Sequence, residues 1–378
     1  MVKVLFLAAP FKSRFIERMT EFFSSEICWK MVISDYSPTK RAPKNLKENI
    51  ADRVLGTRKL IQAAKEFRPD VIYTDNLSYS GQAGIVSCLA QLKAPHILHL
   101  RGDWWTEYSA WYRLASWNKR IRGAPFYFYY WFAIATPTLV TPICRWLERR
   151  VKHYLPWKPT EVVYQGVDPR LFYEEKGFEL EHPAAVIIQN HTLYPKTLGL
   201  LAFRRVIEKL PHVHFYIATG ERRNQPYLPL VEEKLGGLRN VRFLEDVSWP
   251  EGVRRLLSAC DLYILASGLD CCPTTVLEAS LMEKPVLASK IGGIPEIVVE
   301  GETGWTVPNE DVQSWVKKIG LLTSDRGLSA SMGKKGRLWV SERFTWEKIS
   351  RQVEQILTKV ALAGHTAASR QIASERVP

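Results

Sequence analysis

Short apolar runs alternate with longer amphipathic segments along most of the chain. Apolar runs of about four to eight residues predict buried strands, and apolar positions spaced at three and four residues predict helices. In the first part of the chain, the pattern predicts strands and helices at residues 2–9, 15–23, 29–33, 56–68, 70–76, 81–92 and 96–100. Strands that alternate with helices are typical of parallel sheets with helices on both faces.

The same alternation starts again in the second half of the chain. It predicts strands and helices at residues 184–189, 198–209, 213–218, 241–244, 252–259, 262–266, 276–282 and 285–288. Between the two series, a charged stretch with prolines at residues 168–180 fits neither periodicity, which indicates a domain boundary. We therefore predict an α/β protein with two Rossmann-like domains, residues 1–170 and 171–345. The small and polar residues 363–378 are expected to form a disordered tail.

Composition is consistent with two globular domains. The chain has 378 residues, of which 46% are hydrophobic and 24% are charged. The N-terminal apolar run ends at a proline without a small-residue cleavage site, so we expect a first strand and not a signal peptide. The six cysteines show neither a CxxC pair nor zinc spacing, which indicates reduced thiols in a cytoplasmic protein.

Positive charge and tryptophan are concentrated in the first half. Residues 1–170 contain 26 Lys and Arg against 14 Asp and Glu, and seven of the 13 tryptophans lie between Trp104 and Trp157. Basic side chains attract anionic surfaces and tryptophans favour the headgroup boundary. We therefore expect a peripheral contact with an anionic membrane, on the inner face of the cell membrane. A solvated basic face with core aromatics is the alternative, and a nucleic-acid surface is a weaker one.

One strongly apolar run, residues 126–136, lies between Pro125 and Pro137. It is too short to cross a membrane, because a spanning helix needs about 20 apolar residues. We expect a buried helix here that leads into a strand at residues 138–142.

Residues 267–296 contain the pattern of a small-molecule site. Asp270 and Glu278 have seven residues between them, and a buried strand that follows them ends in the turn Gly292-Gly293. Ligands of open α/β sheets bind beyond the carboxyl ends of the parallel strands, where such turns lie. This stretch therefore predicts a ligand site in the second domain.

Six segments, taken in order, resemble a known family. They read RPDVIYTDN, VVYQGVDPRLF, HTLYPKTLGLLAF, DCCPTTVLEA, KPVLASKIGGIPEIVVEGETGWTVP and FTWEKISRQVEQIL. Over about residues 2–362, the chain resembles the retaining glycosyltransferases of family 4, which have the GT-B fold. The resemblance implies that the two Rossmann-like domains face each other across a cleft. It also implies that a C-terminal helix at residues 346–362 crosses back to the first domain.

The resemblance assigns the main donor-binding residues. Glu278 takes the position that binds both ribose hydroxyls of a nucleotide sugar, which suits a carboxylate that accepts two hydrogen bonds. Lys196 takes the position of the cation that binds the diphosphate and stabilises the leaving group, and a surface lysine that caps a helix is the alternative. Glu245 is expected near the base. The loop before Glu278 is expected to cradle sugar and phosphate at a helix N-terminus through Cys272, Thr274, Thr275 and Val276.

Several positions depart from the family pattern. Asp270 stands where the family has a glutamate that contacts sugar hydroxyls, and Pro273 removes one amide donor of the cradle. His191 replaces an arginine that clamps the phosphate, so phosphate binding would depend on pH unless another cation compensates. The first-strand loop is not rich in glycine, which leaves Lys12 as the substitute phosphate contact.

On the acceptor side, Arg101 and Asp103 follow the strand at residues 96–100. Asp103 is expected to hold the acceptor hydroxyl and Arg101 a phosphate, and a purely structural pair is the alternative. The implied reaction transfers a sugar with retention, with neither a metal nor a further cofactor, to a lipid-linked or polysaccharide acceptor. A sugar-nucleotide epimerase on the same fold and a binding protein without catalysis are the rival hypotheses.

Overall fold

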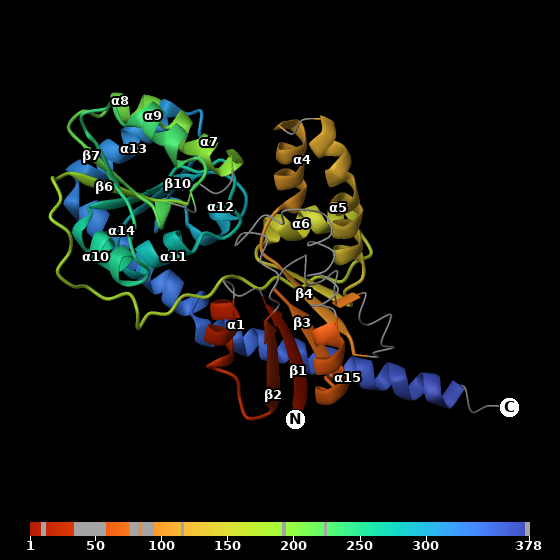
Figure 1. Cartoon of the computed structure of the whole chain (residues 1–378). Helices are drawn as coiled ribbons and strands as arrows, with labels where there is room; N and C mark the ends of the chain where they lie inside the picture. The colour runs from red at the N-terminus through yellow and green to blue at the C-terminus, as the bar shows by residue number, and fades with distance from the viewer. Residues whose placement is uncertain are drawn as a thin grey trace. The chain divides into compact units, whose positions relative to one another are not determined.

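The computed structural model describes residues 1–8, 13–33, 58–75, 83–84, 94–114, 117–190, 194–222 and 225–374. The chain forms two compact units (Figure 1). The first unit comprises Met1–Gly102, Leu114–Tyr164 and Trp346–Pro378, and the second comprises Asp103–Arg113 and Gln165–Thr345. Each unit contains a parallel sheet with helices, which confirms the predicted α/β class with two Rossmann-like domains.

The sheet of the first unit has the strand order β2-β1-β3-β4-β5, with every pair parallel. Its strands are β1 (Val2–Ala8), β2 (Ile27–Ile33), β3 (Val71–Thr74), β4 (His96–Leu100) and β5 (Leu139–Pro142). Alternate side chains of β1 enter two different cores. Val4 and Phe6 lie in the core with the C-terminal helix, whereas Leu5 and Leu7 pack with the helical residues 58–67. A strand covered on both faces needs such an unbroken apolar run.

The helices of the first unit include α1 (Ser13–Thr20), α5 (Trp117–Ala135), α6 (Arg145–Tyr154) and α15 (Trp346–Ser374). α15 packs on β1 and β3 and buries Val353, Ile356 and Leu357, so the C-terminal helix returns to the first unit as predicted. Residues 363–374, which we expected to be disordered, continue this helix. The sequence after residue 360 is rich in alanine, which has the highest helix propensity.

α5 differs from the buried helix predicted for residues 126–136. It starts at Trp117 and passes through Pro125. Ala133 and Ile134 are buried, but Phe128 is 71% exposed. The apolar run is therefore only partly buried, and Phe128 and Phe132 expose their rings to solvent.

The sheet of the second unit has the order β11-β10-β9-β6-β7-β8. Its strands are β6 (Ala184–Ile188), β7 (His214–Ala218), β8 (Val241–Leu244), β9 (Leu262–Leu265), β10 (Val286–Ser289) and β11 (Gly304–Val307). From β6 the chain builds outward to β8, then returns to β9 on the other side of β6 and builds outward to β11. The strand order therefore reverses between β6 and β9, and ligands of such sheets bind where this reversal occurs.

Among its described residues, the second unit has nine helices, and several of them position the site. They are α4 (Trp104–Leu114), α7 (Tyr194–Ala202), α8 (Arg204–Glu208), α9 (Leu228–Leu235), α10 (Glu251–Ala259), α11 (Thr274–Leu281), α12 (Ile294–Ile297), α13 (Val312–Ser324) and α14 (Arg326–Arg343). α7 follows β6 and α11 follows β9. α7 begins before the predicted start at residue 198, which places Lys196 in its first turn.

Candidate active site

Two glycines bring the segments after β6 and β9 into backbone contact. A Cβ atom on Gly199 of α7 would lie 2.2 Å from the carbonyl carbon of Ser267, and one on Gly268 would lie 2.1 Å from the carbonyl oxygen of Pro195. The Gly268 amide donates to the Lys196 carbonyl at 3.0 Å. Because a side chain at either glycine would separate these segments, the glycines fix the distance between α7 and the loop before α11.

This approach places Lys196 beside Asp270. The Lys196 Nζ atom lies 2.6 Å from Asp270 Oδ2, and both side chains are partly buried. Asp270 Oδ1 accepts a hydrogen bond from the Cys271 amide at 3.1 Å. Gly292 packs against the backbone of Asp270. It has φ +51°, and a Cβ on it would lie only 1.8 Å from the Asp270 carbonyl oxygen. We expected Lys196, Asp270 and Asp103 to act in catalysis, and the first two of these residues form one ion pair.

Glu278 lies in the second turn of α11 and is only 2% exposed. Its Oε1 atom accepts a hydrogen bond of 2.8 Å from the indole nitrogen of Trp249. Its Oε2 atom is buried and has no hydrogen-bond partner within the described ranges. Burial raises the pKa of Glu278 to about 7, and the Trp249 hydrogen bond opposes this rise. A buried acceptor without a partner is costly, so Oε2 is suited to a ligand hydroxyl.

The first turn of α11 is fixed mainly by buried contacts. Cys271 and Cys272 are buried, and the Thr275 hydroxyl lies 2.7 Å from the hydroxyl of Tyr263 on β9. We expected the Val276 amide to face an anion, but it donates to the Pro273 carbonyl at 3.2 Å. Pro273 caps the helix without a side-chain hydrogen bond. Thr274 and Thr275 are the first two residues of α11. Their amides lie at the N-terminus of the helix, where the helix dipole favours negative charge.

Glu245, predicted to lie near a nucleotide base, follows β8 and belongs to an exposed ionic cluster. Its Oε1 atom lies 2.5 Å from Arg222 Nη1, and the same guanidinium lies 2.7 Å from Glu232 Oε1. Next to it, Gln225 donates to Asn190 Oδ1 at 3.2 Å across the ends of β6 and β7. These residues lie near the carboxyl ends of β6, β7 and β8. In the strand order, all three strands lie on the same side of β9, the strand that precedes Glu278.

Arg101 and Asp103 have different environments. Arg101 lies 3.3 Å from the buried carboxylate of Asp75, at the end of β3, and its guanidinium stacks over the ring of Phe15 at 4.6 Å. Asp103 is buried and accepts hydrogen bonds from the amide and hydroxyl of Thr106. This is the geometry of a residue that caps the start of α4, so Asp103 has a structural role where we expected an acceptor contact. Sequence reasoning missed Asp75, because its link to Arg101 spans two strands.

The structure leaves some expectations open. His191 and Lys12 lie outside the described residues, so their predicted phosphate contacts have no geometry here. Within the described ranges, no three or more His, Cys, Asp and Glu side chains are grouped as metal ligands would be. The helices that the structure describes include none with the length and apolarity needed to cross a membrane.

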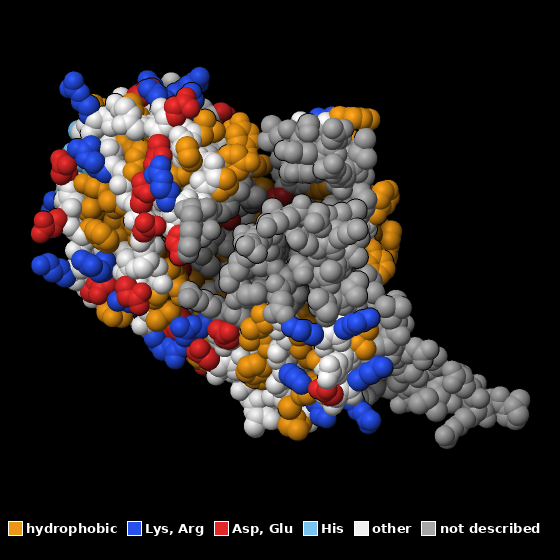
Figure 2. All heavy atoms as spheres, viewed as in Figure 1, with side chains coloured by type: hydrophobic (Ala, Val, Ile, Leu, Met, Phe, Trp, Pro, Cys, Tyr) orange, Lys and Arg blue, Asp and Glu red, His pale blue; other side chains and the backbone are white. Residues whose placement is uncertain are grey.

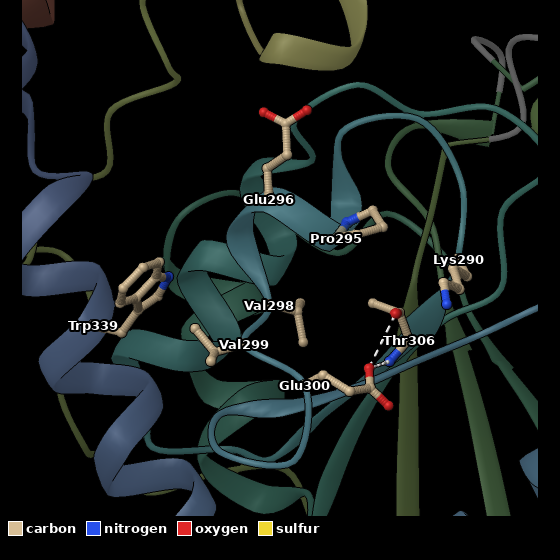
Figure 3. Close-up of a pocket in the computed structure, with 8 residues that line it drawn as sticks. All are labelled: Lys290, Pro295, Glu296, Val298, Val299, Glu300, Thr306 and Trp339. Carbon is tan, nitrogen blue, oxygen red and sulfur yellow. Dashed lines mark hydrogen bonds between the residues drawn. The ribbon is translucent and has the colours of Figure 1, made fainter.

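A hollow of about 430 Å³ lies among α12, β11 and α14, as Figure 3 shows. Its walls are Lys290, Pro295, Glu296, Val298, Val299, Glu300, Thr306 and Trp339. Glu300 Oε2 accepts hydrogen bonds from the amide and hydroxyl of Thr306 at 2.9 and 3.1 Å, whereas the Glu296 side chain points away from this pair. Neither Lys196 nor Glu278 lines this hollow, so it is separate from the candidate active site.

Comparisons with known proteins identify both halves of the chain. The model described as glycosyl transferases group 1 matches residues 195–339, and the model for glycosyltransferase family 4 matches residues 25–171. A D-inositol 3-phosphate glycosyltransferase of Corynebacterium urealyticum is 32% identical over 33% of this chain and 29% of the relative. An N-acetyl-alpha-D-glucosaminyl L-malate synthase of Bacillus anthracis is 23% identical over 60% of each chain. The matches thus span less than two thirds of these relatives.

Solved structures support the fold. Sucrose-phosphate synthase from Thermosynechococcus elongatus superposes with a TM-score of 0.74 at 14% identity and covers 96% of this chain and 100% of its own. HepE of Anabaena, solved in complex with UDP and glucose, gives a TM-score of 0.68 at 19% identity, with 95% and 100% coverage. The chain therefore belongs to the glycosyltransferases with the GT-B fold, and it carries the family 4 and group 1 regions in its N-terminal and C-terminal halves.

Proposed function

We propose that the protein transfers a sugar from a nucleotide-sugar donor to an acceptor hydroxyl, with retention at the anomeric carbon. The observation that carries the proposal is the arrangement at the β6–β9 reversal. There, the Lys196–Asp270 ion pair and the buried Glu278, whose Oε2 has no partner among the described residues, lie on the segments that follow the adjacent strands β6 and β9. A donor needs a cation for its diphosphate, acceptors for its sugar hydroxyls and an acceptor for its ribose, and these residues supply all three.

Donor binding would exchange the partners of Lys196 and Asp270. In the free protein, the ammonium and the carboxylate neutralise each other at 2.6 Å. In the proposed complex, the diphosphate takes the ammonium and the sugar hydroxyls take the carboxylate. Lys196 then stabilises the negative charge that develops on the leaving phosphate, together with the amides at the start of α11. Because these groups supply the positive field, the proposed transfer needs no metal ion.

The departing phosphate is proposed to accept the proton of the attacking hydroxyl on the same face of the sugar. This step keeps the anomeric configuration, and it requires that the acceptor hydroxyl and the phosphate share one face. Asp103 is unsuited to act as base, because Thr106 occupies its carboxylate as a helix cap. UDP-sugars are the first donors to test, since HepE has been solved with UDP-glucose.

We further infer that the acceptor is presented at an anionic membrane surface by the first unit. Trp117 and Phe128 on α5 and Trp157 after α6 are 70%, 71% and 72% exposed. Residues 1–170 hold the excess of Lys and Arg, whereas basic and acidic side chains are mixed over the second unit in Figure 2. Exposed aromatic rings in a part of the chain with excess positive charge suit a headgroup region. A lipid-linked acceptor is the class that this surface favours.

A donor panel with matched variants tests the proposed transfer. UDP-, GDP- and ADP-sugars would be screened for thermal stabilisation of the wild-type protein, and turnover of the stabilising donor would be followed with its product configuration by NMR. Lys196→Ala should lower turnover by at least about 100-fold, because the leaving phosphate loses its cation. Lys317→Ala, a change at an exposed lysine of α13, should leave turnover unchanged. Near-normal turnover in Lys196→Ala, or an inverted product, would contradict the proposal.

A further inference from the structure

The indole of Trp249 donates a hydrogen bond to the Glu278 carboxylate, and backbone hydrogen bonds fix the loop that contains Trp249. The residue lies in the loop between β8 and α10. In this loop, the Val247 amide donates to the Thr219 carbonyl at 3.1 Å, and the Val253 amide donates to the Ser248 carbonyl at 3.0 Å. The loop is thus tied to the end of β7 on one side and to the first turn of α10 on the other.

The contact fixes the orientation of a carboxylate that few other groups touch. The indole donates to Oε1 at 2.8 Å, and Oε2 remains buried without a partner among the described residues. Rotation of the Glu278 side chain would break the bond to Trp249. Trp249 is 42% exposed, so it does not belong to the buried core.

Resting on the function proposed above, we propose that Trp249 is a positioning residue for the donor. It holds Glu278 Oε1 so that Oε2 is presented to a ribose hydroxyl of the nucleotide. Trp249 acts through Glu278 and needs no contact with the reacting atoms.

The same bond also favours the ionised carboxylate. Burial raises the pKa of Glu278, and a donor to the charged form lowers it, so loss of the indole N–H raises it further. Ionisable groups of the neighbouring elements are Tyr263 on β9, Asp270 before α11, with Lys196 paired to it, and Arg337 on α14. Arg337 binds the Leu281 carbonyl at the far end of α11, and β10 has no ionisable side chain. Within the described ranges, no other hydrogen bond reaches the Glu278 carboxylate.

The test is the affinity of Trp249→Phe for UDP, measured by calorimetry between pH 6 and pH 9. At pH 7 we expect affinity to fall by roughly 10-fold or more, since hydrogen bonds to charged groups are among the stronger ones. The pH midpoint of binding should move upward by about one unit, and the deficit should shrink toward pH 9. A residue with a merely structural role would lower affinity equally at every pH.

A double-mutant cycle tests the route through Glu278. In a Glu278→Ala background, Trp249→Phe should cause almost no further loss of UDP affinity, because the side chain it positions is gone. Trp29→Phe, a matched change on β2 of the first unit, should bind UDP like the wild type. Thermal unfolding of each variant checks that the fold is retained.

The outcomes separate this inference from the proposed function. Wild-type protein that binds none of UDP, GDP and ADP overturns the donor site and, with it, the role of Trp249. Wild-type binding of UDP with an unchanged affinity and pH midpoint in Trp249→Phe overturns the positioning role alone. Equal losses in the wild-type and Glu278→Ala backgrounds also overturn it, because Trp249 would then act independently of Glu278.

Discussion

Glu278 makes the folded protein less stable at neutral pH. Its pKa rises from the usual 4.5 to about 7 on burial, so the folded state holds this proton more tightly than the unfolded state. Stability is therefore lost as the pH rises from about 4.5 to about 7, and it changes no further above that. A shift of this size corresponds to about 3 kcal/mol. Binding sites commonly trade stability for function in this way.

Glu278→Gln should remove this pH dependence. The amide keeps the shape of the side chain without a charge, so the variant should be up to about 3 kcal/mol more stable than the wild type at pH 8. At pH 4.5 the two proteins should be nearly equal. Urea unfolding at both pH values measures the difference. The same stability difference at pH 4.5 and pH 8 would show that the buried charge is not its cause.

Among the secondary-structure elements, α7 depends most directly on the absence of a side chain at one position, Gly199. Gly199→Ala would place a Cβ 2.2 Å from the backbone of Ser267, which must move. We expect a loss of about 1–3 kcal/mol in stability, typical of overpacking, and a lower turnover because Lys196 moves with α7. Unfolding curves and initial rates of donor consumption test both effects.

Gly320→Ala is the matched control for this change. Gly320 lies inside α13, and a Cβ there would meet open space. Alanine should stabilise this helix by about 0.5–1 kcal/mol without affecting turnover. If Gly199→Ala behaves like Gly320→Ala, the close approach of α7 to the β9 loop has no energetic importance.

The elements differ in how well the sequence predicts them. The strands β1, β4, β7 and β8 lie at or within one residue of their predicted bounds, because most of their side chains are apolar and each run is short. The start of α7 was placed too late, since its first turn contains Pro195 and its apolar spacing begins only at Leu198. α14 was not predicted, and its three glycines, three serines and five Lys and Arg residues leave little apolar periodicity.

The site was predictable where local motifs carry it. Lys196, Asp270 and Glu278 stand in segments that resemble the family, and the structure gathers the first two into one pair. The bond of Trp249 to Glu278 joins residues that are 29 positions apart, so no local pattern marks it. Asp103 was assigned to the acceptor because it follows a strand, although the spacing Asp103-x-x-Thr106 also fits a helix cap.

At the scale of the whole molecule, the uneven charge predicts salt-dependent membrane binding. The chain should co-sediment with phosphatidylglycerol vesicles at low salt and detach as salt rises, since screening shortens electrostatic reach to about 10 Å at 0.1 M. Phe128→Ser with Trp157→Ser should weaken binding, because both exposed rings are lost. Leu338→Ser, which changes an exposed apolar residue of the second unit, should have no effect. Absence of binding to anionic vesicles at low salt would refute the membrane contact.

The return of α15 to the first unit has a consequence for the order in which the chain is made. A ribosome releases Trp346–Ser374 only after all residues of the second unit have emerged. Until then, the core around Val4 and Phe6 lacks the side chains of Val353, Ile356 and Leu357. The second unit can complete its core first, whereas the sheet of the first unit still lacks α15 on the face that contains Val4 and Phe6. The part of the protein that is synthesised first is thus the last to be finished.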